Sequence, residues 1–174
     1  MRTFISIAFL FLITLNMTAN NPEIGEIRKD LYASVESSLK TEALLKKLQS
    51  MQQKDAVITG YIGTLQALRA KHAWNPYYKV SYLDQASKTL DKAVKLDPRN
   101  IEIRFLRYTV EYFVPPFLGY SKHVAEDRKI LIQEISNKNF NSADIEVIKN
   151  VVNFLIEKAE CSDAEIAKLT QAIR

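Results

Sequence analysis

The chain has 174 residues and a formal net charge of +4, and 47% of its residues are hydrophobic. This length suits one domain that buries its own core without covalent staples. Acidic and basic residues are mixed throughout, and no basic run is longer than Lys46-Lys47. The sequence therefore lacks the basic stripe that nucleic-acid binding requires.

The first residues have the layout of a secretory signal peptide. Arg2 precedes an apolar run from Phe4 to Leu15, and small and polar residues follow. Such a run is shorter than the ~20 residues that a spanning helix needs, which favours a cleaved signal over an uncleaved anchor. We expect a signal peptide over residues 1–19 and one mature domain over residues 20–174, without a transmembrane anchor, in the periplasm or outside the cell.

Cys161 is the only cysteine. A single cysteine cannot form an intramolecular disulfide, so stability must come from packing alone. Cys161 lies one residue before a predicted helix start, and we expect it to be a small apolar filler rather than a reactive or intermolecular thiol.

Apolar residues recur at helical spacing nearly throughout, and no stretch alternates as a strand would. The expected helices run from Ile24 with a possible break near Ser37-Ser38, over residues 54–73, from Pro76 to Leu96, from Asn100 to about Phe113, and then from about Ser121, Ser142 and Ser162. About eight helices joined by short turns predict an all-α fold of antiparallel helical hairpins, either a short solenoid or a bundle.

Two helices carry more specific expectations. Gly60 and Gly63 lie inside the helix over residues 54–73, where each glycine costs ~1 kcal/mol relative to alanine. Their presence predicts that another helix packs very close there. In the helix after Asn100, we expect Arg107 and Glu111 to form an i,i+4 pair on the side that faces water. The opposite, buried side is expected to carry Ile101, Phe105, Tyr108 and Tyr112.

Residues 112–120 read Tyr-Phe-Val-Pro-Pro-Phe-Leu-Gly-Tyr. Pro115 and Pro116 must end the preceding helix, because proline disfavours the α conformation of the residue before it. Phe117 and Leu118 are expected either to fill the corner between two helices or to form an exposed lip for a partner.

Residues 86–98 read ASKTLDKAVKLDP. The spacing of Ala86, Leu90, Ala93 and Pro98 resembles the second helix of a tetratricopeptide repeat, and Gly60 would suit the small position of the preceding helix. Gly60 and Ala86 are further apart in the sequence than the corresponding small positions of that ~34-residue repeat. About two extra helical turns on each arm of the hairpin would account for the difference. The resemblance covers about 40 to 80 residues and implies a protein-interaction or scaffolding role.

One arrangement hints at a metal site. His123, Glu126 and Asp127 share one side of a predicted helix but lack the second histidine of the zincin-type motifs. A solvated helix face, with acids favoured in its first turn by the helix dipole, explains them more simply. The sequence contains no glycine-rich phosphate loop and no nucleophile elbow. We therefore expect no enzyme activity, no metal and no cofactor.

These observations predict an exported, non-enzymatic scaffold or adaptor that binds a protein or peptide in the cell envelope. An envelope carrier that binds a small apolar ligand or lipid between helices is the alternative, and an enzyme using His123 or Asp127 is a third possibility. Aromatic residues and arginine carry much of the energy of interfaces. The residues expected to contact a partner are Trp74, Tyr77, Tyr78, Phe117, Leu118 and Tyr120, with Arg104 and Arg107 as polar contacts.

Overall fold

The computed structural model describes residues 22–140 and 143–174, and this part of the chain is all-α. The signal peptide predicted over residues 1–19 lies outside the described residues. The helices, in chain order, are α1 (Pro22–Ser34), α2 (Ser38–Ser50), α3 (Ala56–His72), α4 (Pro76–Leu96), α5 (Ile101–Phe113), the short 3-10 helix η1 (Pro116–Leu118), α6 (Val124–Ser136), α7 (Ile145–Lys158) and α8 (Asp163–Ala172).

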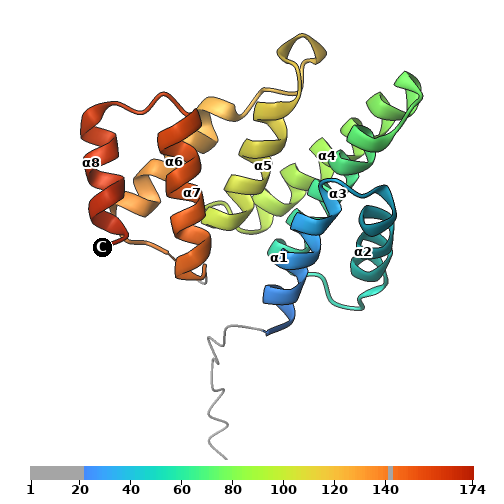
Figure 1. Ribbon diagram of the computed structural model, residues 1–174, viewed down its shortest axis with the longest axis horizontal. Coiled ribbons are helices and arrows are strands. Elements are labelled where there is room, and N and C mark those ends of the chain that lie inside the picture. The colour runs from blue at the N-terminus through green and yellow to red at the C-terminus, as the bar shows by residue number, and fades with distance from the viewer. Residues whose placement is uncertain (1–21, 141–142) are drawn as a thin grey trace, which may run out of the picture.

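Helix α5 lies in the middle of the molecule, with α1–α4 on one side of it and α6–α8 on the other (Figure 1). It contributes to a hydrophobic core on each side. Leu106 joins the core built by α1, α2, α3 and α4. Ile101 and Tyr108 join the core built by α6, α7 and α8. Because one short helix serves both cores, the two groups of helices are tied together through α5.

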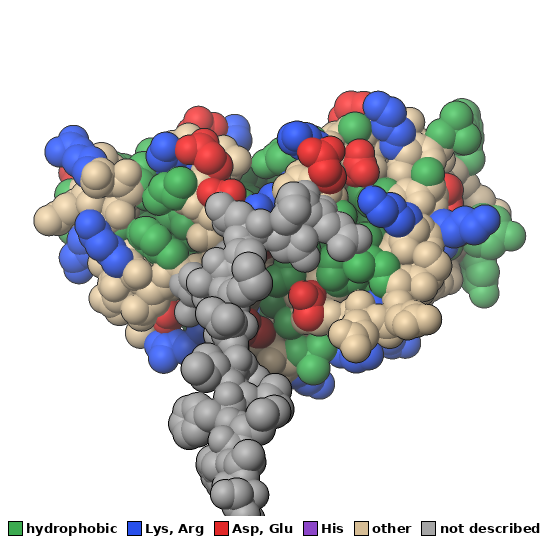
Figure 2. Space-filling model, turned by 90° about the horizontal axis from the view of Figure 1, so that it is seen from below, with side chains coloured by type: hydrophobic (Ala, Val, Ile, Leu, Met, Phe, Trp, Pro, Cys, Tyr) green, Lys and Arg blue, Asp and Glu red, His purple; other side chains and the backbone are tan. Residues whose placement is uncertain are grey.

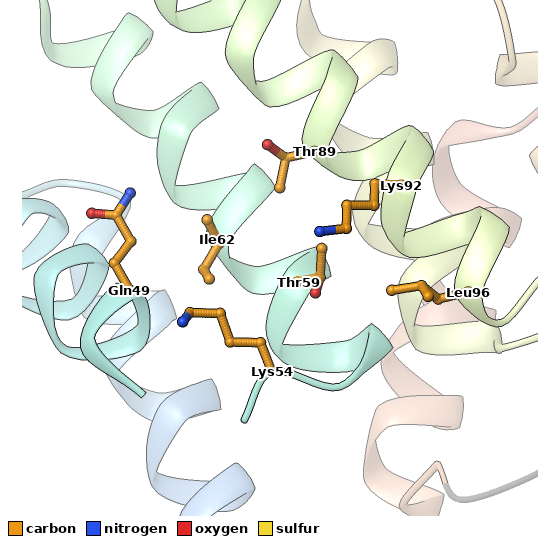
Figure 3. Close-up of a pocket in the computed structure, with 7 residues that line it drawn as sticks. All are labelled: Gln49, Lys54, Thr59, Ile62, Thr89, Lys92 and Leu96. Carbon is orange, nitrogen blue, oxygen red and sulfur yellow. The ribbon is translucent and has the colours of Figure 1, made fainter. Parts of the chain in front are cut away.

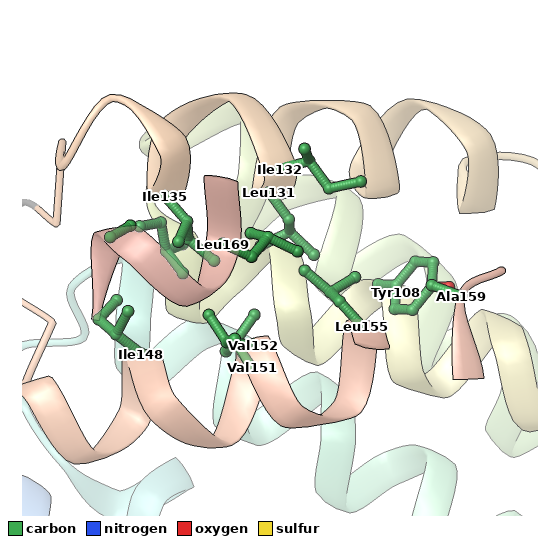
Figure 4. Packing of buried hydrophobic residues seen from close by; sticks show 12 residues of the cluster. Tyr108, Leu131, Ile132, Ile135, Ile148, Val151, Val152, Leu155, Ala159 and Leu169 are labelled. Atoms are coloured by element: carbon green, nitrogen blue, oxygen red, sulfur yellow. The ribbon is translucent and has the colours of Figure 1, made fainter. Parts of the chain in front are cut away.

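The second core is built from branched aliphatic side chains. Figure 4 shows residues of α6, α7 and α8 pointing toward one another, among them Leu131, Ile135, Val152, Leu155 and Leu169. All five side chains are fully buried. Their helical spacing places one apolar stripe of each helix on the same core, as the sequence pattern predicts.

Close packing at the two glycines of α3 is confirmed. A Cβ atom built at Gly63 would lie 2.7 Å from Cγ of Leu90 on α4. One built at Gly60 would lie 3.1 Å from Cδ1 of Leu106 on α5. The glycines therefore let two different helices approach the backbone of α3.

Capping side chains set the helix starts. The predicted caps are confirmed at Asn75, Asn100 and Ser162, whose side chains accept hydrogen bonds from backbone N–H groups of the first helical turn. Ser162 and Glu165 form the predicted capping box. The helix expected from Ser142 begins instead at Ile145, with Asp144 as its cap.

The prediction for the polar side of α5 was wrong. Arg107 and Glu111 do not face water but are buried, and they do not pair with each other. The reason is that α6 packs on this side of α5 and places Asp127 opposite Arg107. Tyr112, expected on the buried side, is partly exposed.

Within the described residues, no helix combines the length and the apolar character needed to cross a membrane.

Candidate functional site

The turn from α3 to α4 and the segment from α5 to α6 lie on the same edge of the molecule (Figure 1). Both carry exposed large apolar side chains. We call this set the aromatic edge. It consists of Trp74, Tyr77, Tyr78, Phe113, Phe117 and Leu118. Five of its members are aromatic, and exposed clusters of this kind mark interaction surfaces more often than isolated apolar residues do.

The turn from α3 to α4 exposes its aromatic residues because its geometry is fixed by capping. Helix α3 ends at His72, and Asn75 then accepts a hydrogen bond from the backbone N–H of Tyr77, with Pro76 at the first helical position. Trp74 lies between these two helix ends and is 98% exposed. Tyr77 and Tyr78 follow in the first turn of α4, and both are exposed.

The segment after α5 is shaped by its two prolines and one glycine. Pro115 is extended, with ψ at 129°, and Pro116 opens the single turn of η1. Gly119 closes that turn in the left-handed region at φ 77°, which glycine adopts without strain. Phe117 is 86% exposed on this turn, so the structure favours the exposed lip over the corner plug.

Tyr120 has a different place from the other predicted contact residues. Its hydroxyl donates a hydrogen bond of 2.7 Å to Oδ1 of Asp84 on α4 and lies 3.4 Å from the carbonyl oxygen of Val80. Partial burial and this hydrogen bond raise the pKa of Tyr120 to about 12. Tyr120 therefore anchors the η1 segment to α4, and its hydroxyl is engaged within the chain.

Arg104 and Arg107 are likewise engaged within the chain. Both are buried between α5 and α6 and both pair with Asp127, which is fully buried. Arg104 Nη1 lies 2.6 Å from Asp127 Oδ1, and Arg107 donates to both oxygens of the same carboxylate at 2.8 Å. These guanidinium groups hold α6 against α5 and are not presented at the aromatic edge.

Two partly exposed acids extend this ion-pair network. Arg104 also binds Glu126, and Arg107 also binds Asp91 of α4 at 2.9 Å. The hydrogen bond from Arg104 lowers the pKa of Glu126. The buried charges of the network thus have partners on three helices, as buried ions must have to be tolerated.

His123, Glu126 and Asp127, which suggested a metal site in the sequence, bind other partners in the structure. Nδ1 of His123 lies 2.7 Å from Oε1 of Glu111, and the backbone N–H of His123 donates to the other oxygen of that carboxylate at 2.6 Å. Asp127 and Glu126 face the arginines instead. No group of three or more His, Cys, Asp and Glu side chains suited to a metal ion occurs within residues 22–140 and 143–174.

These contacts also explain where α6 begins. The sequence favours a helix from about Ser121, yet α6 begins at Val124. Ser121 and His123 are both hydrogen-bonded to Glu111 of α5. That tertiary contact holds Ser121–His123 outside the helix.

A second buried polar cluster was not anticipated by the sequence analysis. Arg28 of α1 donates two hydrogen bonds of 2.8 Å to the carboxylate of Glu102 on α5, which also accepts from the hydroxyl of Tyr61 on α3. Burial, followed by the charge of Glu102, raises the pKa of Tyr61. Glu102 resembles an ordinary acid in a first helical turn, so the sequence carried no sign of this role.

Cys161 is partly buried beside the core of α6–α8, and its thiol lies 3.4 Å from the carbonyl oxygen of Leu155. Burial raises the pKa of this thiol, which disfavours the reactive thiolate. Both observations agree with a packing role.

A surface cavity of about 440 Å³, half open to solvent, lies away from the aromatic edge, between α2, α3 and α4 (Figure 3). Its lining residues are Gln49, Lys54, Thr59, Ile62, Thr89, Lys92 and Leu96. On the face of the molecule seen in Figure 2, positive and negative side chains are interspersed where the surface is not covered in grey. The lining of the cavity, with two amines and no acid, differs from that mixture.

Comparisons with known protein families, with curated proteins and with solved structures found no significant match for this chain. The functional argument therefore depends on the geometry of the described residues.

Proposed function

We propose that this protein is a non-enzymatic interaction module that binds a protein or peptide partner in the cell envelope through the aromatic edge. The observation that carries the proposal is the exposure of this apolar set on a rigid support. Trp74 and Phe117 are almost wholly exposed, although large aromatic side chains are normally well buried in a folded chain. A partner would remove their apolar surface from water.

Rigid support matters because binding is weakened by every side chain or loop that must be ordered in the complex. The η1 segment is held to α4 by Tyr120 and is braced by Pro115-Pro116. Tyr77, Tyr78 and Tyr82 form successive ring contacts along α4 with centroids 6.2 Å apart, and Arg69 stacks on Tyr82 at 4.3 Å. The backbone that carries the aromatic edge is therefore largely preorganised.

The arginines take no part in this proposal, since Arg104 and Arg107 are buried in ion pairs. Tyr120 acts as an anchor of the edge rather than as a contact. The spacing of Ala86, Leu90, Ala93 and Pro98, which resembles a tetratricopeptide repeat, supports an interaction role independently of the exposed residues. The predicted signal peptide supports placing the partner in the envelope.

Site-specific photo-crosslinking tests this proposal. A benzoylphenylalanine placed at Tyr77 or Phe117 in the source cells is expected to crosslink one shared partner. The same probe at Ile145, an exposed apolar position at the start of α7, serves as the matched control. The purified partner should then bind the protein and lose at least about tenfold in affinity for a Trp74→Ala, Phe117→Ser variant, since interface aromatics are worth 1–2 kcal/mol or more. Equal crosslinking from Ile145, or unchanged affinity of that variant, would refute the proposal.

A further inference from the structure

The cavity between α2, α3 and α4 is built by regular helix geometry. Thr59 and Ile62 lie on one side of α3, and Thr89, Lys92 and Leu96 lie on one side of α4. Residues three, four and seven apart share a helix face. The α3 residues form a floor, the α4 residues form one wall, and Gln49 of α2 with Lys54 of the following loop forms the other (Figure 3).

The lining combines two ammonium groups with the apolar side chains of Ile62 and Leu96. Both threonine hydroxyls donate to carbonyl oxygens of their own helices, Thr59 to Asp55 and Thr89 to Gln85. The amine of Lys54 donates to the carbonyl oxygen of Met51 at 2.5 Å and keeps two further hydrogens for another acceptor. Lys92 forms no salt bridge with any described residue. The two lysines, together with the side-chain amide of Gln49, are therefore the available donors of the cavity.

An unpartnered amide oxygen is buried in α3 near this floor but outside the lining of the cavity. Gln66 follows Ile62 by one helical turn, and its position on α3 falls between those of Thr59 and Ile62 around the helix axis. Its side chain is nine-tenths buried, and its Oε1 has no hydrogen-bond partner among the described residues. An orphaned buried acceptor is costly, but Oε1 of Gln66 is enclosed by protein atoms and does not line the cavity, so it contributes nothing to the binding of an anion there.

We propose that this cavity binds a small organic anion with an apolar part, of the class of short-chain fatty carboxylates. The carboxylate lies between Lys54 and Lys92, and the hydrocarbon chain lies against Ile62 and Leu96. The volume of about 440 Å³ lies within the range of about 300–1,000 Å³ found for small-molecule pockets. None of the described lining residues is acidic, so the charge of the site complements an anion and disfavours a cation.

The site is separate from the aromatic edge. Tyr77 lies in the first turn of α4, and Lys92 lies 15 residues further along the same helix. At 1.5 Å per residue these positions are about 22 Å apart. The two sites can therefore be tested independently, and failure of one proposal leaves the other standing.

Calorimetric titration of the purified protein with sodium octanoate provides the test, with 1-octanol as the neutral probe of the same chain length. We expect saturable binding of one octanoate, weakened by salt because the attraction is electrostatic, and binding of 1-octanol at least about tenfold weaker. Each exposed ion pair is worth up to about 1 kcal/mol, so a Lys54→Gln, Lys92→Gln double variant should lose about tenfold or more in affinity.

Lys95→Gln is the matched control, because Lys95 is exposed on α4 but does not line the cavity. Its affinity for octanoate should equal that of the parent protein. Amide shifts in a ¹⁵N spectrum should centre on Thr59, Ile62, Thr89 and Lys92. The proposal would be overturned by absent or non-saturable binding, by equal loss in Lys95→Gln and the double variant, or by shifts centred on Trp74 and Phe117.

Discussion

Tyr120 donates a hydrogen bond of 2.7 Å to the carboxylate of Asp84, and this contact joins two segments that are 36 residues apart in the chain. Asp84 lies on α4, two turns after the tyrosines of the α3–α4 turn. Tyr120 directly follows the η1 turn that exposes Phe117 and Leu118. One hydrogen bond thus anchors the second half of the aromatic edge to the helix that carries the first half.

Replacing Tyr120 with Phe should release this anchor while leaving the core intact. An exposed hydrogen bond of this kind contributes about 1 kcal/mol, so the unfolding midpoint should fall by no more than about 4 °C. Amide hydrogen exchange over residues 117–120 should become faster. Unchanged exchange in this segment would show that the prolines alone hold the η1 turn.

Phe117→Ser should leave thermal stability unchanged within a degree or two, because the ring is 86% exposed. Leu155→Ala is the buried comparison. Truncating a buried leucine costs about 2–5 kcal/mol, and about 2–4 °C per kcal/mol then lowers the midpoint by about 4–20 °C. Thermal unfolding of the two variants and the parent protein measures these midpoints. A large fall in the midpoint of Phe117→Ser would place that ring in the packed structure.

Asp127→Asn should be strongly destabilising. Arg104 and Arg107 would remain buried after losing the charge of their shared, fully buried partner. Breaking a buried ion pair from one side costs about 3–5 kcal/mol, which predicts a midpoint lower by about 6–20 °C. The neighbouring Glu126→Gln serves as the control, since Glu126 is half-exposed and exposed pairs contribute at most about 1 kcal/mol. Similar losses in both variants would contradict this account.

Glycine-to-alanine substitutions at two sites should have opposite effects on the free energy of unfolding. Alanine at Gly63 would place Cβ 2.7 Å from Leu90, which is fully buried, and overpacking of this kind costs about 1–3 kcal/mol. At Gly25 of α1 a Cβ meets no atom within 4 Å, so the better helix propensity of alanine should stabilise the protein by about 0.5–1 kcal/mol. Denaturant unfolding measures the free energy of unfolding of both variants. A stabilised Gly63→Ala variant would show that α4 can move away from α3 without a loss of stability.

The ion pair between Arg128 and Glu165 predicts a pH dependence. The hydrogen bond from Arg128, followed by that from the backbone of Ser162, lowers the pKa of Glu165 from 4.5 to about 2. A carboxylate with a lowered pKa in the folded state stabilises the protein above the unfolded pKa, and this contribution is lost as the pH falls through the folded pKa. The difference in unfolding midpoint between the parent and Glu165→Gln should therefore shrink between about pH 4.5 and pH 2. A constant difference over that range would exclude this contribution.

The aromatic edge could be located in part from the sequence. Trp74, Tyr77 and Tyr78 follow a helix end, and Phe117 and Leu118 follow a double proline, so both sets were expected at helix ends as candidate contacts for a partner. Phe113 was not included, because a residue at the end of an amphipathic helix can face either way. Whether Phe117 is buried was left open, since a turn places its side chain only relative to the helices that pack around it.

Arg104 and Arg107 show why the rest of the candidate site could not be predicted from the sequence. Arg104 and Arg107 were expected at the surface because charged side chains on a helix usually face water. Their burial depends on Asp127, which lies 20 residues after Arg107 and reaches it only when α6 folds back on α5. The pairing of Glu102 with Arg28 and Tyr61 spans still longer separations.

The sequence alone determined the helices of this protein, because helical spacing, capping side chains, prolines and glycines act over a few neighbouring residues. It also indicated that a helix would pack closely on Gly60 and Gly63. The tertiary structure decided which charges are buried, where α6 begins, that Phe117 faces solvent, and that Lys54 and Lys92 line one cavity. Those properties depend on contacts between segments distant in the chain, and the free energy of a buried charge or an exposed ring is set by its neighbours in space.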